Sequence, residues 1–172
     1  MIVTPEMSQI IDEAITDRFI DVHTSLPGAV QSYNAITRTA DIEIQVKRVL
    51  EDENGEHIYE SIGILTNVPV WCYRSAKCYV HIPLEAGDTG LILFSETAIG
   101  QWRAVLGEAY PDDIGRHTLS GAVFLPGLSK DADVIADTLT GGIRMAVDGL
   151  GFVEINKTTG QVNINDNFKV LP

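Results

Sequence analysis

The C-terminal residues 142–171 carry the pattern that most restricts what this chain can fold into. Apolar and polar residues alternate there within short segments, which predicts β-strands over residues 143–148, 152–156, 161–165 and 168–171. Glycine, asparagine, aspartate and threonine between the segments favour turns. Each strand would have one polar and one apolar face, and the apolar faces together contain Ile143, Met145, Val147, Val153, Ile155, Val162, Ile164, Phe168 and Val170.

A sheet this narrow is not expected to be stable by itself, because few side chains can be buried on its one apolar face. That face needs to be covered by the rest of the chain or by further copies of the same strands. The full chain of 172 residues is long enough for one good core with an appendage, and its apolar fraction of 45% is that of a folded protein.

Charge and hydropathy exclude several classes of function. The chain has 24 acidic and 12 basic residues and a net charge of −12, so its surface would repel nucleic-acid phosphates and anionic lipids. No apolar run reaches the ~18 residues of a transmembrane helix. The N-terminal residues lack the basic and apolar regions of a signal peptide, and we expect none.

No recognised catalytic or metal-binding motif is present, so we expect no catalytic residues, no metal site and no cofactor. Cys72 and Cys78 do not form a disulfide framework. Arg116 and His117 are interpreted as loop residues that bind backbone carbonyls, since no nucleophile accompanies them. The acidic segment 51–56 contains Asn-Gly and predicts a hairpin turn rather than a calcium loop.

The rest of the chain predicts a mainly β fold. An amphipathic helix is expected over residues 5–22 and a short helix over 98–105. Strands are expected at 29–33, 41–50, 62–70, 78–82, 89–94 and 122–125, the fifth of them as a fully buried strand. Pro69 indicates an edge strand or a bulge. Short strands with turn signals between them fit a small closed barrel of the OB type.

Three local patterns occur in a fixed order within residues 26–128. The first pattern directly follows the N-terminal helix. The second runs from the third predicted strand to the turn before the fifth. The third is a loop that leads into the last predicted strand of the barrel. Their residues are Leu26, Pro27, Gly28; Pro69, Gly87, Asp88; and Arg116, His117, Ser120, Pro126, Gly127. In this order they resemble the central-spike or membrane-puncturing baseplate proteins of contractile-tailed bacteriophages.

The resemblance implies an OB-type barrel followed by a short trimeric, intertwined β-helix or β-prism. The domains would be an N-terminal helix and turn at 1–25, the barrel at 26–128, a linker at 129–141 and the spike stub at 142–172. Three copies of the stub would cover one another's apolar faces around an axis.

The resemblance also implies a structural, non-enzymatic virion protein that is made in the host cytoplasm. It would plug the tail tube, contact baseplate hub proteins and help to penetrate the host envelope on sheath contraction. Many relatives end in a His-x-His metal motif, but residues 163–172 contain no histidine. We therefore expect no apex metal and a separate tip protein at the C-terminal end.

The alternative is a free OB-type module that binds an oligonucleotide or oligosaccharide. Such a site needs aromatic and basic residues on one face of the barrel. Tyr73, Arg74, Lys77 and Tyr79 are the nearest approach to such a cluster. An enzyme is the least favoured reading, because no oriented base, nucleophile or metal set can be named.

Overall fold

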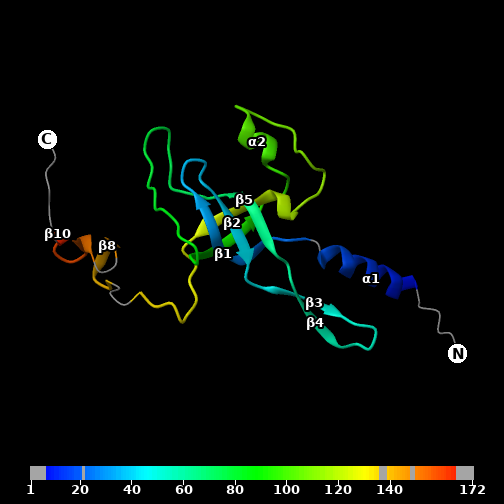
Figure 1. Cartoon of the computed structure of the whole chain (residues 1–172). Coiled ribbons are helices and arrows are strands. Elements are labelled where there is room, and N and C mark those ends of the chain that lie inside the picture. The colour runs from blue at the N-terminus through cyan, green and yellow to red at the C-terminus, as the bar shows by residue number, and fades with distance from the viewer. Residues whose placement is uncertain (1–6, 21, 136–138, 148–149, 166–172) are drawn as a thin grey trace. The chain divides into compact units, whose positions relative to one another are not determined.

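The computed structural model describes residues 7–20, 22–135, 139–147 and 150–165 (Figure 1). The chain divides into two compact units, Met1–Lys130 and Asp131–Pro172. Both are mainly β, and they are described separately below.

The N-terminal helix α1 covers Met7–Ile20. This confirms the helix predicted over 5–22 except at Val22, which lies beyond its end, and residues 5, 6 and 21 lie outside the described residues. Its apolar side chains Ile10, Ile11, Ile15 and Phe19 are exposed. None of the helices among the described residues is long and apolar enough to cross a membrane.

The first unit is built on a five-stranded sheet in the order β5-β2-β1-β6-β7. The strands are β1 Ser25–Asn34, β2 Thr39–Ile44, β5 Ile64–Pro69, β6 Thr89–Phe94 and β7 Ala122–Pro126. All neighbouring strands are antiparallel. The sheet curls into a half-barrel. Its two edges touch just after β5, where Val70 forms a parallel bridge with Phe124 of β7. The next residue, Trp71, donates its N–H to the Phe124 carbonyl at 2.8 Å.

The core of this unit lies inside the curled sheet. Its buried members are Val30, Ala40, Ile42, Ile44, Val68, Ile92, Phe94, Ala122 and Phe124. Gly28 and Gly90 face each other across β1 and β6. A Cβ on Gly28 would lie 2.5 Å from Ile42, and a Cβ on Gly90 would lie 2.5 Å from Phe124. The two glycines therefore let the largest core side chains approach the backbone.

The predicted strand over 41–50 is wrong as a single element. β2 ends at Ile44, and the chain leaves the curled sheet to form β3, Lys47–Glu51, which pairs with β4, His57–Ser61. The alternation of Ile42 and Ile44 continues to Val46, beyond the end of β2, so periodicity alone does not reveal where the partner strand changes. The predicted turn at 51–56 is confirmed, and Asp52 accepts hydrogen bonds there from the N–H groups of Asn54 and Glu56, both at 2.8 Å.

Three further predictions need correction. Residues 78–82 form no strand but only one bridge, between Arg74 and Tyr79. Strand β6 is buried on one face, because Leu93 on the other is 40% exposed. Helix α2 covers only Gly100–Ala104, and a 3-10 turn at Leu119–Gly121 precedes β7. Pro69 ends the edge strand β5, as predicted.

The second unit is a three-stranded antiparallel sheet in the order β10-β9-β8. Its strands are β8 Gly142–Val147, β9 Gly151–Asn156 and β10 Val162–Asn165. These confirm three of the four strands predicted for the C-terminal region. The fourth, over 168–171, lies outside the described residues.

Candidate subunit interface

One face of the second unit consists of apolar side chains. The strand register aligns them in two rows of three, Ile143–Ile155–Val162 and Met145–Val153–Ile164. Val147 follows on β8, opposite Gly151. The alternation read from the sequence therefore corresponds to a single surface, and two of the residues assigned to it, Phe168 and Val170, lie outside the described part of the chain.

This apolar face is open to solvent in the isolated chain. The exposed fractions of its seven described side chains run from 38% for Val153 to 72% for Ile143. In an ordinary half-buried sheet the apolar face packs on a core and the polar face is solvated. A contiguous exposed apolar patch on a folded protein marks an interaction surface.

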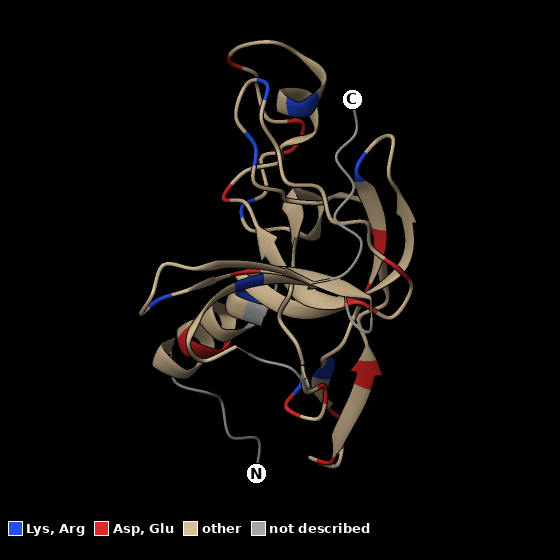
Figure 2. Cartoon of the chain, turned by 90° about the vertical axis from the view of Figure 1, so that its left-hand side faces the viewer, with Lys and Arg blue, Asp and Glu red and all other residues tan. Residues whose placement is uncertain are grey.

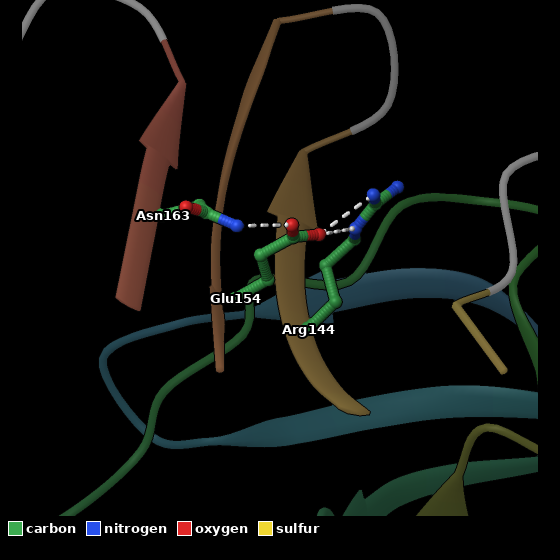
Figure 3. A network of polar contacts seen from close by, with 3 residues as sticks. All are labelled: Arg144, Glu154 and Asn163. Atoms are coloured by element: carbon green, nitrogen blue, oxygen red, sulfur yellow. Dashed lines mark hydrogen bonds and ion pairs between the residues drawn. The ribbon is translucent and has the colours of Figure 1, made fainter. Parts of the chain in front are cut away.

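The opposite face is held by a polar network (Figure 3). Arg144 donates two hydrogen bonds to the same oxygen of Glu154, from Nε at 3.1 Å and from Nη2 at 2.8 Å. Asn163 donates to the other carboxylate oxygen at 2.8 Å. The network joins all three strands, and the Arg144 guanidinium also lies 4.2 Å from the centre of the Phe152 ring.

The network is well shielded for a surface feature, since the Arg144 and Glu154 side chains are only 16% and 15% exposed. The hydrogen bonds from Asn163 and then Arg144 lower the pKa of Glu154 below its ordinary value. Both donors favour the ionised carboxylate. The polar residues thus fix the sheet, while the apolar residues on the other face are left without cover.

The turn between β9 and β10 is also well defined. The Asn156 side-chain oxygen accepts from the N–H groups of Thr158 and Thr159 at 2.9 and 3.0 Å. Lys157 binds the Thr140 carbonyl through Nζ at 3.2 Å. These contacts define the β9–β10 turn and join it to Thr140, two residues before β8.

Several residues of the three sequence patterns lie in the strands of the first unit or directly after them. Leu26, Pro27 and Gly28 lie in β1 and pair with β6, and Pro126 ends β7. Gly127 follows β7 and donates its N–H to the Thr89 carbonyl at 3.1 Å.

The turn before β6 is docked on β1. Asp88 accepts from the Glu85 N–H at 2.8 Å, and its own carbonyl accepts from the Val30 N–H at 2.8 Å. Gly87 has a φ of 101°, which explains why glycine occupies this position. This motif therefore shapes the half-barrel.

Arg116 and His117 make two different contacts. The imidazole Nδ1 of His117 lies 3.4 Å from the Phe94 carbonyl, which is the kind of contact predicted. Arg116 instead pairs with the exposed carboxylate of Glu96. Nearby, the hydroxyls of Thr118 and Ser120 share a hydrogen bond of 2.8 Å.

The aromatic and basic cluster suggested by the sequence is divided by the structure. Arg74, Lys77 and Tyr79 line one hollow together with Arg38 and His81. Tyr73 lies elsewhere, with its ring 4.5 Å from that of Trp71. Arg38 was missed because it lies 36 residues before Arg74 in the sequence and only the fold brings the two together. Among the described residues, no group of His, Cys, Asp and Glu is placed to hold a metal ion.

The curled sheet and its motif residues coincide with a domain known from phage proteins. Residues 26–127 match the family model described as the phage protein Gp138 N-terminal domain. The match covers more than half of the chain, so this phage protein belongs to the Gp138 N-terminal domain family. Comparison with curated proteins finds no match.

Proposed function

We propose that the chain is a structural virion protein that forms the trimeric central spike or hub of a contractile tail baseplate. The observation that carries the proposal is the exposed apolar face of β8, β9 and β10 on a member of a phage protein family. Around a three-fold axis, three copies of this face would cover one another and form a closed core. The described strands would then be the beginning of an intertwined β-helix or β-prism.

In this proposal the first unit is an OB-type barrel that joins the spike to the tail. Its strand order and the parallel contact between its two edges support that interpretation. The barrel would contact the tail tube and hub proteins and help to close the end of the tube.

The proposed work is mechanical and non-enzymatic. On sheath contraction the spike would be pushed into the host envelope, and its hydrogen-bonded strands would resist unfolding. The net charge of −12 would limit adhesion to an anionic cell surface. A separate tip protein would cover the C-terminal end of the spike.

The oligomeric state of the full chain tests the proposal. We expect a trimer at micromolar concentration by light scattering coupled to size-exclusion chromatography. A clean monomer under these conditions would refute the trimer and with it the spike.

Two substitutions in β10 sharpen this test. Ile164→Asp places a carboxylate on the apolar face, where Ile164 is 49% exposed in the isolated chain, and burial in a trimer would leave that charge unpaired. We expect the trimer to dissociate. Asn165→Asp adds the same charge at the next residue, on the opposite face, and should leave the trimer intact. Equal behaviour of the two variants would show that this face is not the interface.

A further inference from the structure

A hollow in the first unit lies between the β1–β2 turn and the hairpin formed by residues 71–82, which are neighbours in Figure 1. The two segments are joined by direct contacts. Tyr33 Oη and His81 Nε2 lie 3.0 Å apart, and the Val70 N–H donates to the Arg38 carbonyl at 2.9 Å. The hollow has a volume of about 400 Å³, which suits one small ligand.

The hairpin presents different side chains on its two faces. Its pairing is set by the Arg74–Tyr79 bridge and by the Val80 N–H, which donates to the Tyr73 carbonyl at 2.9 Å. Alternation then turns Cys72, Arg74, Tyr79 and His81 toward the hollow. The other face carries the Trp71–Tyr73 ring pair, so the hollow is lined by the polar face of the hairpin.

The lining of the hollow is positively charged in a strongly acidic protein. Acidic residues are spread along the chain (Figure 2), and they outnumber basic ones by 24 to 12. Three of the 12 basic residues, Arg38, Arg74 and Lys77, nevertheless line this hollow, and no aspartate or glutamate does so among the described residues.

The positive charge has no compensating partner in the part of the chain that the structure describes. None of the ion pairs there includes Arg38, Arg74 or Lys77. The Arg38 guanidinium donates a hydrogen bond from Nη1 to the Cys72 sulfur, at 3.8 Å. The hydrogen-bond donors of these cations are therefore available to an anion from solution.

We propose that this hollow binds a single sugar-sized ring that carries one phosphate or carboxylate group. Guanidinium groups bind both kinds of oxyanion through paired, charge-assisted hydrogen bonds. Tyr79, which is 72% exposed, would contact the ring of the ligand. The net charge of −12 opposes a long polyanion such as nucleic acid, whereas one anionic group can be neutralised locally. All the residues that line the hollow belong to the first unit, so binding there does not require the proposed trimer.

Calorimetric titration of the full chain tests the site with four probes: a hexose phosphate, glucuronate, neutral glucose and inorganic phosphate. We expect the hexose phosphate, the glucuronate or both to bind, and to shift the backbone amide resonances of residues 35–38 and 72–81. Glucose should not bind. Inorganic phosphate should bind more weakly than the hexose phosphate, and Tyr79→Ala should remove that difference.

Two double variants distinguish binding at a defined site from non-specific attraction to positive charge. Arg74→Gln with Lys77→Gln should weaken binding about tenfold or more, because a hydrogen bond to a charged group contributes at least that factor. Lys47→Gln with Arg48→Gln removes the same charges from the β3–β4 hairpin and should leave the affinity unchanged. Circular dichroism would verify that both double variants are folded.

Several results would overturn the proposal. Equal loss of affinity in both double variants would indicate non-specific attraction. If glucose bound as tightly as the charged sugars, the anionic group would have no part in binding. Tighter binding of a glutamate-rich peptide or of single-stranded DNA would assign the hollow to a macromolecular partner. No binding by either charged sugar would refute the site.

Discussion

Asp41 holds three strands together at the point where the sheet changes register. The β1–β2 pairing shifts between Val30 and Ser32, and the β2–β5 pairing shifts between Ala40 and Ile42. The Asp41 carboxylate accepts from the Ser32 hydroxyl at 2.8 Å and from the Asn67 N–H at 2.9 Å. These bonds, the one from Asn67 first, lower the pKa of Asp41, so the ionised side chain stabilises both irregularities.

Gly28 can be tested directly as a packing position. Gly28→Ala would place a methyl group 2.5 Å from Ile42 and 2.8 Å from Ile92, and such overpacking costs about 1–3 kcal/mol of stability. The free energy of unfolding is measured by urea denaturation. In the control Gly141→Ala, the added Cβ has no atom within 4 Å, so the change should stay within about 0.5 kcal/mol. Equal effects of the two substitutions would contradict the close approach across β1 and β6.

The ionisation of Glu154 predicts acid sensitivity of the second unit. Its folded pKa is lowered from the ordinary value of 4.5, so its stabilising contribution is complete above that pH. The contribution is lost as the pH falls through the lower folded pKa, because the unfolded state then binds more protons. Glu154→Gln should lower the melting temperature at neutral pH.

The difference in melting temperature between the Glu154→Gln variant and the original chain should shrink as the pH falls below 4.5. Thermal unfolding followed at several pH values measures this. Glu108→Gln, at an exposed position, serves as the control and should show no such trend. A difference that stays constant with pH would show that the carboxylate charge is not responsible.

At the level of elements, β3 and β4 differ from every other strand of the first unit. They pair only with each other and lie outside the five-stranded sheet. Val49 and Tyr59 face each other across the pair and are 53% and 61% exposed. A two-stranded hairpin without a packed face has little to stabilise it beyond its own hydrogen bonds.

We therefore expect local opening of this hairpin. Backbone amides of Lys47–Glu51 and His57–Ser61 should exchange with deuterium much faster than those of Thr89–Phe94, since β6 lies between β1 and β7. Hydrogen exchange followed by mass spectrometry on the full chain measures the rates. Protection of β3 and β4 equal to that of β6 would show that another surface covers the hairpin.

At the level of the whole molecule, two separate units predict separable roles. Removal of residues 142–172 should abolish the trimer and leave the half-barrel folded, because the core residues from Val30 to Phe124 all lie in the first unit. Light scattering gives the oligomeric state, and circular dichroism with thermal unfolding gives the fold. A truncated chain that still forms trimers would place the assembly surface on the half-barrel or on α1.

Much of the second unit could be predicted from sequence because its contacts are local. The alternation in β8, β9 and β10 and the turns between them lie within residues 142–165, so strand positions and the apolar face follow from neighbouring residues. The Arg144–Glu154–Asn163 network was not predicted. Strand register decides whether a polar residue meets a partner across the sheet, and alternation alone does not give the register.

For the chain as a whole, the sequence by itself determined the mainly β class, the N-terminal helix, the β3–β4 turn and the apolar face. These depend on periodicity and turn residues, which act over a few positions. Only the tertiary structure decided that β2 ends at Ile44, that Gly28 lies opposite Gly90, and that Arg38 joins Arg74 around one hollow. Each of these depends on residues far apart in the chain, and their contacts exist only once the sheet has curled.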